Sequence, residues 1–301
     1  MELQTDTAKK IEMSSPPSGF RVVAREFKKD KLAMFSLVGI TVIIFGILIA
    51  SLFVDQTEVM RVSLKGKFAE PGENGYILGA DHGGRDILGQ LIIGGRNSIL
   101  IAIAITVITG IVGITIGLVT GYYGGLVDNF FMRIIDFFMT LPMMMMIIVF
   151  VTLIPKYNVT SFIIILSIFL WVGTARLIRS KSLSESRRDY VNASKTMGTR
   201  DSAIIFGGIM PNISSLIIVE LTLSFAGNIG IETGLTFLGF GLPPATPSLG
   251  TLVAYAVDPV VLSSKWWVWV PASLLILVLM LGINYVGQAL RRSADARQRL
   301  G

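Results

Sequence analysis

Six long apolar runs constrain this chain more than any other feature. They cover residues 33–54, 98–122, 134–154, 161–178, 213–235 and 266–289. Each is close to the roughly 20 mostly apolar residues that a membrane-spanning helix needs. Composition agrees, because only 15% of the residues are charged, whereas soluble domains carry about 25%. The sequence therefore predicts an all-α integral membrane protein with six transmembrane helices.

The runs divide the chain into predicted regions. These are a basic N-terminal segment (1–32), a first transmembrane helix (33–54), an extracellular loop (55–95), a five-helix core containing a polar loop at 179–211 (96–290) and a C-terminal tail (291–301). The first run is too long for a cleavable signal peptide, and no A-x-A-like site follows it. We therefore expect it to remain as an anchor.

Lysine and arginine are concentrated in a few parts of the chain. Of the 26, seven precede the first run, seven lie in residues 176–211 and four follow the last run. By the positive-inside rule, such parts face the cytoplasm. Both termini and the polar loop are therefore predicted to be cytoplasmic. The net charge of +6 is interpreted as a topology signal and as contacts to lipid or protein, with no nucleic-acid partner.

Several patterns argue against catalysis by this chain. It has no cysteine, which excludes disulfides and thiolate metal sites. His82 is the only histidine, and a metal site needs three or four converging ligands, so we expect an exposed loop histidine and no metal. No G-x-x-x-x-G-K-[ST] phosphate loop occurs. Gly113, Gly117 and Gly121 recur every four residues, which predicts a close helix–helix contact.

The polar loop carries the most informative motif, DYVNASKTMGTRDSAIIFGGIMPN at residues 189–212. The register of Ala193, Gly198 and Pro211 resembles the "EAA" loop of ABC-importer permeases, Glu-Ala-Ala, three residues, Gly, nine residues, Ile-x-Leu-Pro. Four positions depart from that pattern, namely Asn192, Ser194, Gly208 and Met210. Glycine can end a short helix with φ > 0, and proline fits the first turn of the next helix.

That resemblance implies a short helix that docks in a cleft of a separate ATPase and carries the motion of ATP binding into the membrane. The alternative is an ordinary loop with a chance glycine and proline. The residues implied in ATPase coupling are Tyr190, Asn192, Ala193, Ser194, Gly198 and Pro211.

Three further segments extend the resemblance to residues 20–292. They are FRVVAREFKKDKLAMFSLVGI, YILGADHGGRDILGQLIIGGRNSI and ETGLTFLGFGLPPATPSLGTLV, and they are similar to segments of the C-type permease subunit of oligopeptide and dipeptide importers. In the second segment Asp81, Gly84, Arg85 and Asp86 match the family, and Ala80 replaces its threonine. The resemblance implies a type I ABC importer permease fold in the bacterial cytoplasmic membrane.

The same resemblance implies the partners. They are a homologous second permease, two ATPase subunits that bind ATP and Mg, and an extracellular peptide-binding protein, with membrane lipid around them. This chain would then be a transport subunit with no cofactor of its own. Asp81, Arg85 and Asp86 are predicted to dock the binding protein.

Candidates for the translocation path are Met143, Glu220, Asn228 and Glu232. Flexible methionine can line a promiscuous surface, and polar groups inside a membrane usually face a cavity or a protein partner. For the two glutamates, contact with a peptide and a structural hydrogen bond to another helix remain equal alternatives.

Rival functions remain at this stage. A permease for nickel or another dipeptide-type substrate would share these motifs. A secondary transporter would use ions and inverted repeats, and no internal repeat is visible.

Overall fold

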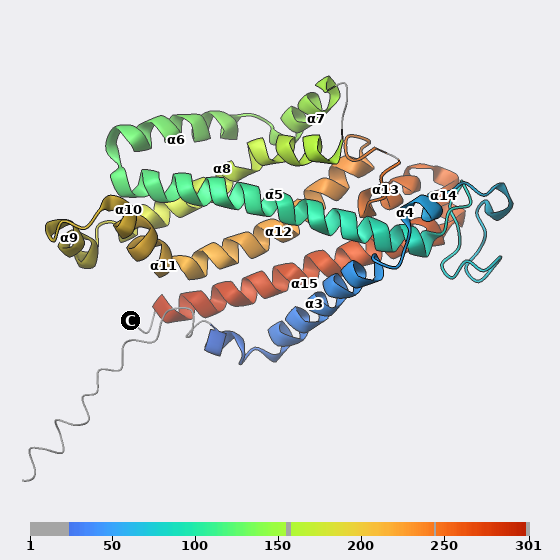
Figure 1. The fold of residues 1–301 in the computed structure, drawn as a ribbon, viewed down its shortest axis with the longest axis horizontal. Helices are drawn as coiled ribbons and strands as arrows, with labels where there is room; N and C mark the ends of the chain where they lie inside the picture. Colours follow the sequence, from blue (N-terminus) through green and yellow to red (C-terminus); the bar gives the residue numbers. More distant parts are fainter. Residues whose placement is uncertain (1–23, 155–157, 244, 299–301) are drawn as a thin grey trace, which may run out of the picture.

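The computed structural model describes residues 24–154, 158–243 and 245–298. Five long helices dominate this part of the chain and run along the long axis of the molecule (Figure 1). They are α3 (Lys31–Ala50), α5 (Ile87–Tyr123), α8 (Val159–Glu185), α12 (Ser214–Phe237) and α15 (Trp266–Gln298). Each is long and apolar enough to cross a membrane. The described residues contain no strand, so the all-α prediction is confirmed.

The third apolar run differs from the single transmembrane helix predicted for residues 134–154. The structure divides it into α6 (Gly125–Thr140) and α7 (Met143–Leu153), which meet at 85° and form a sixth span only if counted together. Pro142 explains the break, because proline lacks an amide donor and disfavours helical geometry at the residue before it. Leu141 accordingly has an extended backbone, with φ −85° and ψ 140°.

Helix boundaries also differ from the predicted regions. α5 starts at Ile87, where the Asp86 carboxylate accepts the amides of Leu88 and Gly89. The helix therefore takes in the last part of the predicted 55–95 loop, and its 37 residues rise about 55 Å at 1.5 Å per residue. α15 likewise continues into the predicted 291–301 tail. Of the predicted 1–32 segment, residues 1–23 lie outside the described part.

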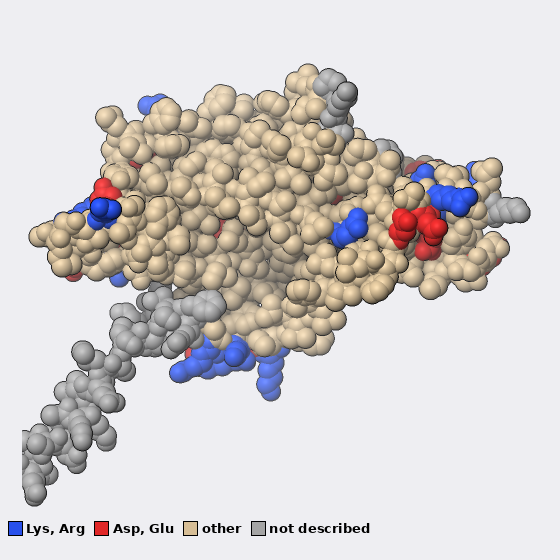
Figure 2. Space-filling model, viewed as in Figure 1, with Lys and Arg blue, Asp and Glu red and all other residues tan. Residues whose placement is uncertain are grey.

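Short elements gather at the two ends of the bundle (Figure 1). One end holds α9 (Asp189–Thr196), α10 (Asp201–Ala203), the π-helical turn η2 (Ile204–Ile209) and α11 (Met210–Asn212). The other end holds α4 (Gln56–Val59), η1 (Leu64–Gly66), α13 (Leu249–Ala254), η3 (Tyr255–Val257) and α14 (Pro259–Ser264). In the view of Figure 2, charged side chains lie at both ends and near the start of α3, and the middle is almost free of charge. This distribution fits a bundle whose middle lies in lipid.

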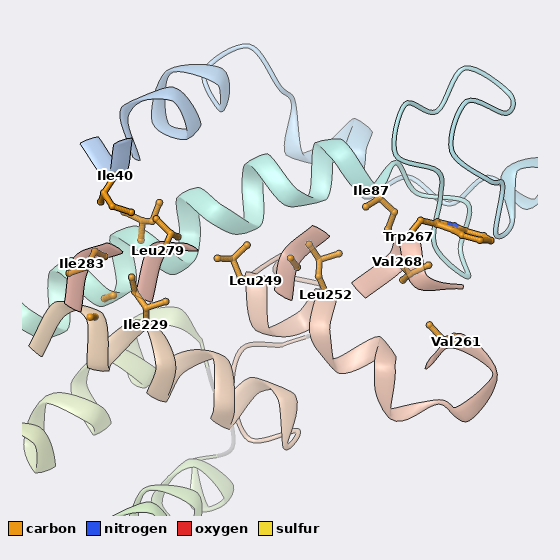
Figure 3. Packing of buried hydrophobic residues seen from close by; sticks show 14 residues of the cluster. Ile40, Ile87, Ile229, Leu249, Leu252, Val261, Trp267, Val268, Leu279 and Ile283 are labelled. Carbon is orange, nitrogen blue, oxygen red and sulfur yellow. The ribbon is translucent and has the colours of Figure 1, made fainter. Parts of the chain in front are cut away.

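Two kinds of packing hold the helices together. The largest cluster of buried side chains joins α3, α5, α12, α13 and α15, and includes Ile40, Ile229, Leu249 and Leu279 (Figure 3). α5 and α8 instead approach closely along the predicted glycine face. A Cβ at Gly117 would lie 2.7 Å from the Ala175 carbonyl oxygen and 2.9 Å from the Arg179 amide nitrogen.

We expect Gly117→Ala to destabilise the α5–α8 contact, because the methyl group would meet backbone atoms that cannot move aside. Gly173→Ala is the matched control, since Gly173 lies in α8 with nothing within 4 Å of the added Cβ. Both changes raise helix propensity by about 1 kcal/mol. The difference between the two variants in free energy of unfolding therefore measures the clash at Gly117, about 1–3 kcal/mol.

The measurement is the thermal unfolding midpoint of the purified protein in detergent. Gly173→Ala should match or exceed the wild type, and Gly117→Ala should fall below it. Equal midpoints for the two variants would contradict the close contact.

Candidate functional site

The segment from α9 to α11 forms a separate unit at one end of the bundle. α9 is a short helix, and Gly198, with φ +75°, turns the chain after it. The Thr199 amide donates to the Ser194 carbonyl oxygen at 3.0 Å, which satisfies one of the free carbonyls at the helix end. The predicted short helix and its glycine stop are therefore present. Pro211 lies at the first turn of α11, as its missing donor favours.

One side of α9 faces solvent and the other faces the protein. Asn192, Ala193 and Gly198 are exposed, whereas Val191 is buried. Met197, at the helix end, is 76% exposed. Sequence reasoning did not select Met197, because the motif concerns small residues and not the side chain before the glycine.

The inner side of this segment is fixed to α5 and α8. Val191 and Ile204 belong to a buried cluster that also contains Leu118 of α5 and Ile178 of α8. The Tyr122 hydroxyl at the end of α5 donates to Asp201 Oδ1 at 2.6 Å. Lys195 Nζ lies 4.4 Å from the centre of the Tyr122 ring, within the range of a cation–π contact. Tyr122 therefore joins both α9 and α10 to α5.

Tyr190, one of the predicted coupling residues, serves this anchoring more than the outer surface, and Ser194, another of them, is half-buried and bonds within α9. Tyr190 packs against the same buried cluster, and Ser194 Oγ donates to the Tyr190 carbonyl oxygen at 2.8 Å. Burial raises the pKa of the Tyr190 hydroxyl, so it stays protonated at neutral pH. The outer surface consequently rests on Asn192, Ala193 and Met197.

Two of the predicted path residues lie inside the protein. Glu232 is fully buried and accepts hydrogen bonds from Ser98 Oγ at 2.8 Å and Thr236 Oγ1 at 3.1 Å. Ser98 Oγ in turn accepts the Leu249 amide at 3.1 Å, which links α5, α12 and α13. Asn228 Nδ2 donates to Thr106 Oγ1 of α5 at 2.9 Å. Glu232 and Asn228 therefore each make a hydrogen bond to another helix, and both are buried in this chain.

Glu220 and Met143 have different surroundings. Glu220 is half-buried, and its Oε1 accepts a hydrogen bond from Thr174 Oγ1 of α8 at 3.0 Å. Ser224 Oγ lies 3.4 Å from the same oxygen. Met143 is partly buried and packs against the cluster between α5, α7 and α8. Of the four candidates, only Glu220 combines a charge with partial exposure.

At the opposite end, Asp81 organises the loop that was predicted to dock a binding protein. Its buried carboxylate accepts the amides of Gly83 and Arg85 at 2.7 and 3.0 Å, and Gln90 Nε2 at 3.1 Å. The Tyr255 hydroxyl donates to it at 3.2 Å. Burial and the Asp81 charge raise the pKa of Tyr255 to about 12, so this donor stays protonated at neutral pH.

These contacts correct the docking expectation for Asp81, because its buried side chain is unavailable to a partner. Asp86 caps α5, and Arg85 is half-buried with its Nη1 3.8 Å from Asp81. His82 is exposed, as predicted, and its ring packs edge-on against Tyr255. Within the described ranges, no three His, Asp or Glu side chains group as metal ligands.

The long apolar helices define a multi-pass membrane protein, with a short solvent-facing helix fixed to the ends of two of them. Residues 113–300 match the family model described as "Binding-protein-dependent transport system inner membrane component". The chain belongs to this family. Residues 18–65 match the model "N-terminal TM domain of oligopeptide transport permease C".

Curated relatives agree with the family. The "Oligopeptide transport system permease protein OppC" of Lactococcus lactis subsp. lactis is 52% identical over 276 residues, covering 92% of this chain and 94% of the relative. The protein of the same name from Bacillus subtilis is 32% identical and covers 91% and 88%. The "Dipeptide transport system permease protein DppC" of Haemophilus influenzae is 34% identical and covers 90% and 92%.

We expect Tyr122→Phe to loosen the α9–α11 segment without unfolding the bundle, because the change removes one hydroxyl whose partner is a carboxylate. Hydrogen bonds to charged groups contribute about 1.5–3 kcal/mol, so local opening should increase roughly tenfold or more. Limited trypsin cleavage after the exposed Lys195 and Arg200 measures this opening.

The control is Tyr285→Phe, which removes a phenolic oxygen on α15 in a different buried cluster, with Phe27 and Ala33. It should leave the cleavage rate unchanged. If Tyr122→Phe is cleaved at the wild-type rate, the hydroxyl does not anchor the segment.

Proposed function

We propose that this chain is one of the two permease subunits of an ATP-driven oligopeptide importer. The observation that carries the proposal is the 52% identity, over 92% of the chain, to a protein named as an oligopeptide permease. The chain contains no phosphate loop, so an ATP-driven importer built from it needs a partner that binds ATP. The exposed surface of α9 supports the proposal because it offers that partner a place to dock.

In this proposal, each partner has a distinct task. Two ATPase subunits bind ATP and Mg, and one of them contacts Asn192, Ala193 and Met197 on the outer side of α9. A homologous second permease completes the translocation path, and an extracellular binding protein delivers peptide at the opposite end. Exposed residues around the Asp81 loop form the surface for the binding protein, while Asp81 itself keeps that loop in shape.

Coupling then follows from the contacts of the segment. A displacement of α9 is passed to α5 through Tyr122 and to α8 through the buried cluster around Ile178. Pro211 and α11 lead directly into α12. The bound ATPase thus acts on three membrane helices through one segment. Alternating access between two conformations requires helices to move together in this way.

The test of this function is transport by the assembled complex in proteoliposomes. We expect labelled tripeptides and longer peptides to accumulate inside the vesicles. This accumulation should require ATP on the cytoplasmic side of the permease, which is the vesicle interior, and the binding protein outside. Accumulation of Ni²⁺ in place of peptide would support the nickel alternative. Uptake driven by an ion gradient without ATP would identify a secondary transporter.

Sidedness and ATPase docking can be tested at one position, because the chain contains no cysteine. We expect a Met197→Cys variant to resist an impermeant maleimide in intact cells and to react in inverted vesicles. Bound ATPase subunits should protect it, since the side chain lies on the proposed contact surface.

Asn74→Cys is the control, since Asn74 is an exposed residue of the opposite end. It should react in intact cells. Labelling of the Met197→Cys variant in intact cells would reverse the orientation, and labelling unaffected by the ATPases would remove α9 as their contact.

A further inference from the structure

A short basic turn leads into α3, and we call residues 24–31 the α3 elbow. Phe27 is buried at its centre and packs against the C-terminal part of α15. Asp30 caps α3 by accepting the Ala33 amide at 3.0 Å, and it also accepts Arg292 Nη2 of α15 at 3.0 Å. The elbow therefore has a fixed position on the bundle, where the start of α3 meets α15.

The elbow has a surplus of positive charge. It contains four cations, Arg25, Lys28, Lys29 and Lys31, and two carboxylates, Glu26 and Asp30. Glu26 pairs with Lys29 at 2.6 Å. Asp30 is engaged by Arg292, so both carboxylates already have partners. The other three cations are exposed, and none of them forms an ion pair with a residue of the described ranges. Figure 2 shows basic side chains gathered beside the start of α3.

An exposed apolar stripe continues from the elbow along α3. Its side chains are three or four residues apart and therefore share one face, and each is more than half exposed. The stripe consists of Phe35, Val38, Val42, Phe45 and Ile49. Lys31 lies four residues before Phe35, so it stands at the elbow end of the same face. From Phe35 to Phe45 the stripe rises about 15 Å at 1.5 Å per residue, half of the roughly 30 Å hydrocarbon core of a bilayer.

We propose that the α3 elbow and this half of the stripe bind one anionic phospholipid. The phosphate lies at Lys28 and Lys31, and an acyl chain follows the stripe from Phe35 to Phe45. Unpaired cations next to a membrane helix are suited to anionic headgroups. Lysine fits this place because its long stem can lie on apolar surface while its ammonium group stays in water. Cations and stripe also follow each other in the order that headgroup and acyl chain have in a bilayer.

Such a lipid would help to hold α3 at the edge of the bundle. Only Ala33 and Ile40 of α3 are buried, so the helix has little protein contact along most of its length. The lipid adds contact on the exposed face and neutralises charge in the elbow. A topology signal alone requires no particular lipid. The inference does not rest on the proposed function, because it requires only that α3 crosses a membrane, as its length and apolar composition allow.

The experiment measures which lipids the full-length chain retains. The chain is purified together with the second permease from mixed micelles that contain equal amounts of phosphatidylglycerol and phosphatidylcholine. Native mass spectrometry counts the lipids that stay bound. We expect the wild type to retain phosphatidylglycerol preferentially. This preference should fall by about fivefold for each cation removed, or roughly 25-fold in Lys28→Gln/Lys31→Gln.

The matched control is Arg187→Gln/Arg200→Gln, which removes two other exposed cations from the same end of the bundle. It has the same net charge as the test variant and should keep the wild-type preference. Lys28→Arg/Lys31→Arg keeps both charges and should keep it as well. Gel filtration of each variant establishes that it is folded and assembled before lipids are counted.

Three results would overturn the proposal. Equal loss of preference in the test and control variants would show general charge attraction only. A wild-type complex without preference would mean that the second permease covers the elbow and the stripe. Displacement of the lipid by soluble glycerol phosphate would identify a site for a free anion and leave the stripe without a role.

A second measurement locates the acyl chain. The chain has no cysteine, so Val38→Cys carries a single fluorescent label on the stripe, and Ile111→Cys carries it at an exposed position of α5. Brominated phosphatidylglycerol at low mole fraction should quench the label at residue 38 more strongly, and brominated phosphatidylcholine should quench both alike. Adding Lys28→Gln/Lys31→Gln should remove the difference. Equal quenching of both labels by phosphatidylglycerol in the wild-type background would contradict a bound lipid on the stripe.

Discussion

The close contact between α5 and α8 is the constraint on which the rest of the structure depends. Glycines on α5 allow the two backbones to approach within van der Waals distance, and the pair then serves as a common support. At one end it carries the α9–α11 segment through Tyr122 and Ile178. α6 is tied to it by Arg179, which donates twice to Asp128 at 2.5 Å. At the far end Ser98 joins α5 to Glu232 of α12.

Polar groups inside the bundle follow a consistent pattern. In a lipid environment an unpaired polar group has no water to replace a missing partner, so it must be satisfied by protein. Glu232 is surrounded by hydroxyls, and Asn228 is paired with Thr106. Both pairs lie between helices that pack closely. Glu220 differs because it is half-buried and its one strong partner, Thr174, lies on α8, which packs little against α12.

Much of the fold could be predicted from the sequence because it depends on local patterns. The apolar runs, the glycine face and the stop at Gly198 each follow from spacing or backbone preference within one segment. The bend at Pro142 also follows from the local sequence, because proline breaks a helix. Mean hydropathy over a window of residues does not register one proline, so it indicates one continuous run. Helix ends were missed where helices continue beyond the apolar run, as α5 does toward Ile87.

The candidate site was harder to predict because its roles depend on contacts between distant segments. Asp81 matches a family pattern on a polar loop, which suggested an exposed docking residue. Its actual role depends on Gln90 and on Tyr255, far along the chain. Tyr122 was passed over for the same reason, since nothing near it in sequence indicates that Asp201 and Lys195 converge on its ring and hydroxyl. Local sequence thus specifies the helices well and their mutual contacts poorly.

The packing divides the core into two helix pairs that suit a moving path. α5 packs most extensively against α8, and α12 packs most extensively against α15. Contact between the pairs is strong where α5 meets α12, through Asn228 and Glu232. Between α8 and α12 lies a cleft lined by Leu177 and Lys181 on one side and Leu216 and Val219 on the other, and Thr174 of α8 donates a hydrogen bond to Glu220 of α12. A rotation about the α5–α12 contact would widen or close this cleft while both pairs stay intact. Since α9 is fixed to the first pair and α11 leads into the second, a displacement of this one segment acts on both sides of the cleft at once.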